Sequence, residues 1–235
     1  MTIDQKLPMK HILYILLLLG AGGPAAWGQK KVEQQLPLAK GQRVHLDFEF
    51  ATTIDVKTWD EPRVLVKASA SVNEGQDDEA YELTAVNDGE VLRFVSRLRD
   101  KEKLFRRMDS ARQFEGITQD GKVLKIKEYY EVYVPRNVQL SLKTTLGSST
   151  IEHNNGPLAV ETVTGDIELR CATGQPANIT AKTVTGGMYT NLPFENQSKK
   201  GLPRLAGEES QIQINGGGVP IALETVTGDV TIRKK

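Results

Sequence analysis

The amino-acid sequence predicts an all-β protein, a β-helix or β-roll-like solenoid preceded by a less regular N-terminal β region. Apolar and polar residues alternate with period two along most of the chain, which is typical of strands that bury one face. Glycine turns separate these alternating segments. One strand–turn–strand unit recurs in the C-terminal half, and such units must stack to share a core.

Residues 1–28 have a different composition from the rest of the chain. Lys10 precedes an apolar run from Ile12 to Leu19, which is shorter than the roughly 20 residues needed to span a membrane. Ala26-Trp27-Gly28 places small residues where a signal peptidase cuts. We expect a cleaved secretory signal, a mature chain that begins at Gln29, and export to the periplasm, the cell surface or the medium. An uncleaved anchor is the alternative.

The charge balance and the cysteine count exclude several classes of protein. The chain has 30 basic and 30 acidic side chains, and loss of Lys6, Lys10 and Asp4 with the signal would leave 28 and 29. A nucleic-acid partner is disfavoured, because such domains usually carry a basic excess. The single cysteine, Cys171, can form no internal disulfide and lies too far from the signal for lipid attachment. After signal cleavage we expect no membrane span.

Residues 29–137 form the predicted N-terminal β region. Asn87-Asp88-Gly89 lies between two alternating runs and predicts a hairpin. Residues 77–83 could instead form a short helix. The polar segment 101–121 is expected to be a long loop that leads into a strand over residues 123–134. Further strands are expected over residues 44–50, 54–58 and 64–68.

Residues 138–235 contain the repeat. The sequence Glu-Thr-Val-Thr-Gly-Asp occurs at 161–166 and again at 224–229, a third copy lies at 179–188, and a weaker one at 140–149. We expect one continuous domain over residues 29–235, in which the copies stack coil upon coil and residues 191–218 hold a degenerate or looped-out copy. The turn glycines are Gly147, Gly165, Gly186 and Gly228, and the threonines expected to form a ladder are Thr144, Thr162, Thr183 and Thr225.

Three sequence features together resemble the DUF4097 family of putative adhesins. They are Ile54-Asp-Val-Lys-Thr-Trp-Asp60, Tyr130-Glu-Val-Tyr-Val-Pro-Arg-Asn137 and the Thr-Val-Thr-Gly-Asp segments that follow a signal peptide. The resemblance covers nearly all of the predicted mature chain. It implies a right-handed, single-stranded β-helix-like fold in a cell-envelope or exported protein, and it assigns no catalytic residues.

The repeat also contains acidic residues that could serve calcium binding or catalysis. Asp166 and Asp229 follow turn glycines, as calcium ligands do in some parallel β-rolls, but their period is about twice the nonapeptide of those folds. Glu161 and Asp166 could form a carboxylate pair like that of glycosidases, with Glu224 and Asp229 repeating it. An active site breaks the symmetry of a repeat, and these residues obey it. We therefore expect them to be structural.

The remaining candidates are two histidines, one cysteine and a basic segment. His45 and His153 lack the spacing of a metal site, and Cys171 has no histidine nearby in sequence. We expect no cofactor and no metal. An anionic surface polymer could bind the basic segment, whose arginines Arg93, Arg97, Arg99, Arg106 and Arg107 are the candidate contacts, although a solvated strand-and-loop edge is the simpler explanation.

These observations favour a non-catalytic exported scaffold that binds a surface glycan or an unidentified envelope protein. The alternatives are a polysaccharide lyase or hydrolase on the same fold, and a structural or regulatory envelope protein without a soluble ligand. We expect a monomer, because the last strand, Val230 to Arg233, is followed by two lysines that discourage end-to-end strand addition.

Overall fold

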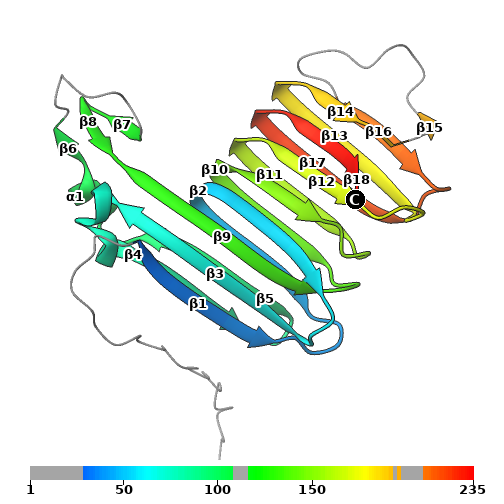
Figure 1. Cartoon of the computed structure of the whole chain (residues 1–235), viewed down its shortest axis with the longest axis horizontal. Helices are drawn as coiled ribbons and strands as arrows, with labels where there is room; N and C mark the ends of the chain where they lie inside the picture. The colour runs from blue at the N-terminus through cyan, green and yellow to red at the C-terminus, as the bar shows by residue number, and fades with distance from the viewer. Residues whose placement is uncertain (1–28, 108–115, 193–194, 197–208) are drawn as a thin grey trace, which may run out of the picture.

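The computed structural model describes residues 29–107, 116–192, 195–196 and 209–235, and most of them lie in strands (Figure 1). The predicted signal and half of the segment 191–218, namely residues 193–194 and 197–208, lie outside the described residues. The N-terminal strands are β1 (Lys30–Pro37), β2 (Arg43–Trp59), β3 (Arg63–Val72), β4 (Tyr81–Asn87), β5 (Val91–Leu98), β6 (Arg106–Arg107), β7 (Ile117–Gln119), β8 (Lys122–Leu124) and β9 (Ile126–Pro135), with helical turns at Asn73–Gly75 and Asp78–Ala80 and helix α1 at Lys101–Leu104. The remaining strands are β10 (Leu140–Glu152), β11 (Leu158–Thr164), β12 (Ile167–Cys171), β13 (Ala177–Thr185), β14 (Met188–Thr190), β15 (Glu195–Asn196), β16 (Glu209–Ile214), β17 (Val219–Thr227) and β18 (Val230–Lys234).

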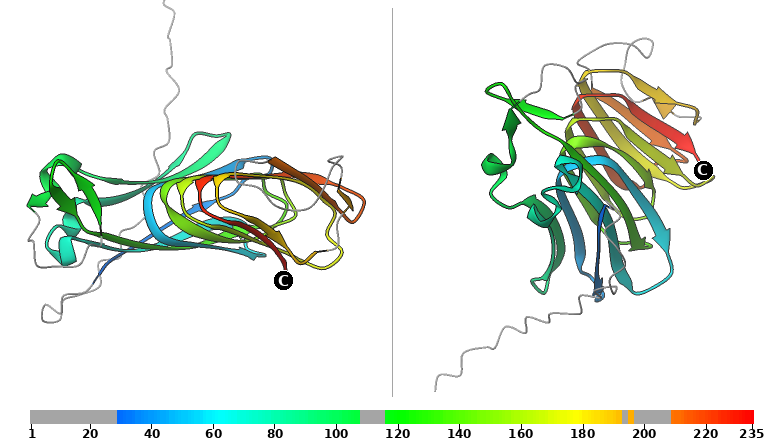
Figure 2. Two further views of the ribbon diagram at one scale, coloured as in Figure 1. Left: turned by 90° about the horizontal axis from the view of Figure 1, so that it is seen from above. Right: turned by 60° about the vertical axis from the view of Figure 1, so that its left-hand side comes forward.

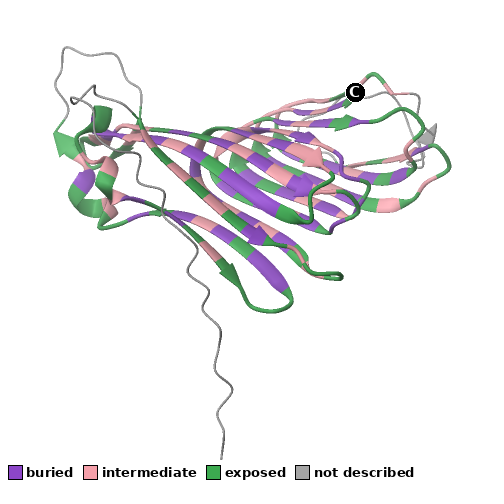
Figure 3. Cartoon of the chain, turned by 60° about the horizontal axis from the view of Figure 1, so that its bottom comes forward, coloured by how far each residue is buried: buried purple, intermediate pink, exposed green. Residues whose placement is uncertain are grey.

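The large mixed sheet bends over itself into two layers that enclose the core (Figure 2). Two long strands, β2 and β10, run through both layers and pair in parallel on each side of the bend. The first layer has the order β4-β5-β2-β10-β11-β17-β13-β16-β15, and the second has the order β1-β3-β9-β2-β10-β12-β18-β14. Buried and exposed residues alternate along the strands, so one apolar core fills the space between the layers (Figure 3).

The repeated segments lie side by side in parallel register, but their spatial order differs from their order in the chain. Thr144 pairs with Thr162, Thr162 with Thr225, and Thr225 with Thr183. The last copy, β17, is therefore inserted between β11 and β13. The segment before it does not form another parallel copy, because β16 lies antiparallel to β13. Chain order alone predicted a sequential stack, and that detail is wrong.

The turn glycines form a column in which each backbone lies against the next. A Cβ atom on Gly165 would lie 2.1 Å from the carbonyl oxygen of Gly147, and one on Gly228 would lie 2.2 Å from that of Gly165. A Cβ on Gly186 would lie 2.0 Å from the carbonyl oxygen of Gly228. These glycines also have φ between +143° and +154°, a conformation that residues with a side chain rarely adopt. Both the conformation and the close approach require glycine.

The threonine and the aspartate of the motif hold neighbouring copies together. The hydroxyl of Thr225 donates to Gly165 O at 3.0 Å, and that of Thr183 donates to Gly228 O at 2.9 Å. The backbone N–H of Asp229 donates to Asp166 Oδ1 at 2.8 Å, and that of Gly187 donates to Asp229 Oδ1 at 2.7 Å. Gly187 occupies the aspartate position in the third copy, and the ladder ends there, since within the described residues β14 pairs only with β18. Thr144 donates within its own strand, to Leu146 O, and in the described part of the chain the buried Thr162 hydroxyl has no partner.

This ladder predicts that the aspartates act through their oxygen atoms and not through their charge. Asp229→Ala should lower the free energy of unfolding by about 1 kcal/mol, since it removes a hydrogen bond to a neighbouring backbone. Asp229→Asn keeps an acceptor at the same place and should be nearly neutral. Urea denaturation of both variants, with and without added calcium or chelator, checks this. A large effect of Asp229→Asn, or a calcium-dependent midpoint, would favour a calcium site.

The N-terminal half follows the predicted strands with a few differences. The Asn87-Asp88-Gly89 hairpin is confirmed, since β4 and β5 pair antiparallel. The two predicted strands over 44–50 and 54–58 are one bent strand, β2. Residues 78–80 form a single helical turn, and the predicted loop over 101–121 contains α1, β6 and β7, with 108–115 outside the described residues.

The last strand of the chain is not an edge of the sheet. β18 lies between β12 and β14 and pairs in parallel with both. Lys234 and Lys235 therefore do not protect an exposed sheet edge, so the reason given for expecting a monomer is wrong. The monomer itself stays a prediction. No helix in the described ranges is long and apolar enough to cross a membrane.

Candidate functional site

The arginines of the predicted anionic-ligand site do not converge on one point. Arg93, Arg97 and Arg99 lie on or just after β5, whereas Arg106 and Arg107 lie in β6, beyond α1. Four of the five contact a carboxylate, so most of their charge is compensated locally. The pairs are Arg93 with Asp88, Arg97 with Asp47, Arg99 with Glu82, and Arg106 with Asp77, while Arg107 is exposed.

The histidines and the cysteine have structural surroundings. His153 is 5% exposed, with Nε2 3.1 Å from Gly156 O and Nδ1 3.2 Å from Gln175 Oε1, so it fixes the turn in which it lies. His45 Nδ1 lies 2.7 Å from Ser141 Oγ, and burial lowers its pKa. Burial raises the pKa of Cys171 to about 11, which keeps the thiol protonated at neutral pH. Within the described ranges, the His, Cys, Asp and Glu side chains form no group of three or more that could hold a metal ion.

One buried polar network lies outside the repeat, in the N-terminal β region. Tyr130 Oη donates to Glu128 Oε2, and Tyr81 Oη donates to Tyr130 Oη at 3.2 Å. The Tyr130 ring stacks on Phe48 with the ring centroids 4.0 Å apart. Burial raises the pKa of Glu128 to about 8, with the Tyr130 hydrogen bond opposing part of the rise. Because β4 and β9 belong to opposite layers, this network joins the two layers through the core.

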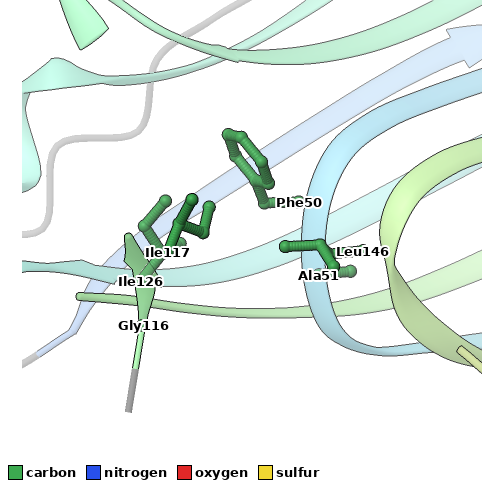
Figure 4. A pocket seen from close by; sticks show the side chains of 6 residues that line it. All are labelled: Phe50, Ala51, Gly116, Ile117, Ile126 and Leu146. Carbon is green, nitrogen blue, oxygen red and sulfur yellow. The ribbon is translucent and has the colours of Figure 1, made fainter. Parts of the chain in front are cut away.

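A small pocket lies near this network, at the bend of β2 and β10 (Figure 4). Its volume is about 200 Å³. Glu128 is only 2% exposed and is not part of the lining, so the pocket offers no acid, base or nucleophile from its side chains. The lining residues are Phe50, Ala51, Gly116, Ile117, Ile126 and Leu146.

The outer face of the second layer carries a cluster of aromatic and charged side chains, which we call the Trp59 cluster. It consists of Trp59, Tyr133, Lys57, Arg63, Lys67 and Glu131, and it lies where β2, β3 and β9 run side by side. The rings of Trp59 and Tyr133 lie 5.1 Å apart between centroids, with their planes inclined by 33°. Trp59 Nε1 donates to Arg63 O at 2.9 Å, which fixes the indole against the start of β3.

Cations surround both rings of the Trp59 cluster. The guanidinium of Arg63 lies 5.2 Å from the Trp59 ring centroid, and the ammonium groups of Lys57 and Lys67 each lie 5.7 Å from that of Tyr133. Such contacts attract a cation to the ring face. Lys57 also contacts Glu131 at 2.6 Å, and the Tyr133 hydroxyl donates to the same carboxylate at 2.8 Å. The hydrogen bond from Lys57 lowers the pKa of Glu131, so this carboxylate is ionised at neutral pH.

Sequence reasoning did not select the Trp59 cluster as a site, although the sequence contains a signal for it. In the parts of β2 and β9 that pair with each other, the buried positions are Ile54, Val56, Tyr130, Val132 and Val134. Trp59 and Tyr133 lie at the alternate positions of these strands, whose side chains face solvent and are usually polar. Both are partly exposed. Large aromatic residues on the solvent side of a strand mark a surface that can bind a partner.

The described fold and surface define an all-β protein with a broad open sheet and an aromatic surface cluster. No family model matches the chain, and no relative is found among curated proteins. A search of solved structures returns matches that include the following three. A "putative cell adhesion protein" from Clostridium sporogenes is 10% identical, with a TM-score of 0.45, over 88% of this chain and 100% of that one.

The other two structures are each described as a "putative adhesin". The protein from Bacteroides fragilis is 10% identical with a TM-score of 0.21, over 88% of this chain and 97% of that one. The protein from Parabacteroides distasonis is 8% identical with a TM-score of 0.22, over 88% and 98%. At these scores the likeness carries no functional argument, and membership of the DUF4097 family stays a prediction.

Proposed function

We propose that this protein is an exported, non-catalytic adhesin-like scaffold whose Trp59 cluster binds a glycan at the cell envelope or surface. The observation that carries the proposal is a pair of partly exposed aromatic rings on an open sheet face, surrounded by hydrogen-bonding groups of both signs. A pyranose ring has an apolar face that packs on an aromatic side chain and a rim of hydroxyl groups. Lys57, Arg63 and Glu131 supply donors and acceptors for that rim.

The stacked copies give this surface a rigid support. In our proposal they form a short β-helix-like scaffold, and β2 carries the Trp59 side chain on a strand that continues through both layers. A binding residue on a strand is held more precisely than one on a loop. Export is proposed from the N-terminal sequence, and a glycan at the envelope is the ligand that such a location would offer.

The absence of a catalytic role is part of the proposal. Glu128, the described carboxyl group whose pKa is raised to about 8, is buried in the core. The repeated Asp166 and Asp229 accept hydrogen bonds from neighbouring backbone, and the exposed Glu161 and Glu224 lie in register on an outer sheet face. A glycosidase instead needs two carboxyl groups that flank one bond in a cleft.

Trp59→Ala should weaken glycan binding about tenfold or more, because it removes an aromatic contact at the centre of the cluster. Tyr133→Ala should have a similar effect. Glycan-array screening followed by calorimetry of the best ligand measures this. Tyr189→Ala is the matched control, since Tyr189 is 57% exposed on β14, outside the cluster. Equal affinities of the Trp59 and Tyr189 variants, both folded by circular dichroism, would contradict the proposal.

A further inference from the structure

The charges around the two rings of the Trp59 cluster are balanced. Lys57 contacts Glu131 at 2.6 Å and Asp55 at 3.3 Å. Lys67 lies in register between Glu33 on β1 and Glu131 on β9. Including Arg63, three cations lie at the rings, and three carboxylates contact these cations or lie in register beside them: Glu131, Asp55 and Glu33. At the nearby strand ends Arg136 contacts Asp60 at 2.8 Å, which adds one charge of each sign.

This balance determines which ligands the surface can favour. An acidic sugar brings a carboxylate that would be attracted by the three cations and repelled by the three carboxylates, so it gains little net electrostatic energy. It would also have to compete with Glu131 for the ammonium group of Lys57, a contact that is already made. A neutral sugar meets no such conflict, because each hydroxyl group both donates and accepts. Carboxylates accept from its hydroxyls, and ammonium and guanidinium groups donate to them.

The predicted basic segment does not change this conclusion. Its arginines lie on or after β5 and in β6, not on β2, β3 or β9, and four of them contact carboxylates of their own. Long-range attraction of a polyanion needs a field of one sign. Among the described residues, four of the five arginines of the basic segment are paired with carboxylates, and the charges around the Trp59 cluster on the second layer are balanced.

We infer that the ligand of the Trp59 cluster is a neutral glycan, and that acidic glycans such as uronic-acid polymers are discriminated against. This inference rests on the proposed function. Glu131 is the residue that sets the discrimination, because its carboxylate lies against Lys57, lies next to Lys67 in register and accepts from the Tyr133 hydroxyl. The binding free energy should come from ring contacts and hydrogen bonds, which salt screens weakly.

Calorimetry of the full protein with two sets of hexasaccharides tests the inference. The neutral set contains hexamers of glucose, mannose and galactose, and the acidic set contains hexamers of galacturonic and mannuronic acid. One neutral hexamer should bind about tenfold or more tightly than every acidic one. Its affinity should change less than about twofold between about 50 mM and about 500 mM salt. Glu131→Gln leaves an excess positive charge and should narrow the neutral-over-acidic preference several-fold, whereas Glu82→Gln, on β4 away from the cluster, should not.

The outcomes separate the ligand class from the proposed function. If an acidic hexamer binds tightest, weakens as salt rises and is lost in Trp59→Ala, the neutral-ligand inference is overturned and the Trp59 cluster remains a glycan site. If Trp59→Ala changes the affinity for no hexamer, or no hexamer binds, the proposed function fails and the inference fails with it. If Glu131→Gln leaves the preference unchanged, the discrimination does not arise from this carboxylate and the inference is overturned.

Discussion

Gly165→Ala should lower the free energy of unfolding by roughly 3–5 kcal/mol, an unusually large effect for the addition of one methyl group. The new Cβ would lie 2.1 Å from the carbonyl oxygen of Gly147, and backbone on the neighbouring strand has little room to move. The residue also has φ of +149°, which alanine rarely adopts. Gly165 lies inside the stack, between Gly147 and Gly228, so a shift there would disturb both neighbours. Guanidinium denaturation followed by circular dichroism measures the loss.

Gly174→Ala provides the matched control for the glycine column. Gly174 also has a positive φ, of +81°, but a Cβ there would meet nothing within 4 Å. Its substitution should cost only about 1 kcal/mol, since only the conformational preference is violated. If the two variants lose equal stability, close approach of the backbones is not the reason for the glycines. If Gly165→Ala gives no folded protein, comparison of soluble yield with Gly174→Ala gives the same ranking.

Glu128→Gln should remove most of the pH dependence of stability between about pH 5 and about pH 8. Burial raises the pKa of Glu128 to about 8 in the folded protein, from an ordinary value of 4.5. The stabilising contribution of the protonated form is therefore fully present below about pH 4.5 and is lost as the pH rises through about 8. The slope is at most about 1.4 kcal/mol per pH unit, so the loss across this window is on the order of 2–4 kcal/mol.

Unfolding midpoints in urea at several pH values between 4 and 9 test this expectation. The glutamine is uncharged at every pH, so the variant should be the more stable protein at about pH 8 and should show a flatter profile. Glu90→Gln is the control, because the Glu90 side chain is 85% exposed and its substitution should leave the slope unchanged. If the free energy of unfolding of the wild-type protein stays constant from about pH 5 to about pH 8, the pKa of Glu128 is not raised in the folded protein and the expectation is wrong.

The repeat could be read from the sequence because its chemistry is local. Alternation places Leu158, Val160 and Thr162 on one face, and the structure buries all three. The aligned threonines and glycines also meet in register, as their equivalent positions predicted. What alignment could not provide is the order of the copies, because parallel strands with the same motif can pair in more than one order.

The Trp59 cluster could be predicted only in part. The alternation of apolar and polar residues predicts that the side chains of Trp59 on β2 and Tyr133 on β9 face solvent. Their proximity does not, because it depends on parallel pairing of β2 with β9, strands separated by about 70 residues in the chain, through register pairs such as Lys57 with Tyr133 and Trp59 with Pro135. The same holds for the buried network of Glu128. Alternation places Glu128 and its partner Tyr130 in the core, but Tyr81, which donates to Tyr130, comes from the opposite layer.

The sequence by itself determined most of the long strands, the turn glycines and the residues that these strands turn inward, because these follow from backbone conformation and from the pattern of apolar residues. Only the tertiary structure shows that β2 pairs in parallel with β10, which joins the predicted N-terminal region 29–137 to the repeat region 138–235 in one sheet. It also decided that β17 lies between β11 and β13. The physical reason is that hydrogen bonds between strands are alike whichever strands they join. The choice of neighbours therefore depends on the whole core, which no short segment encodes.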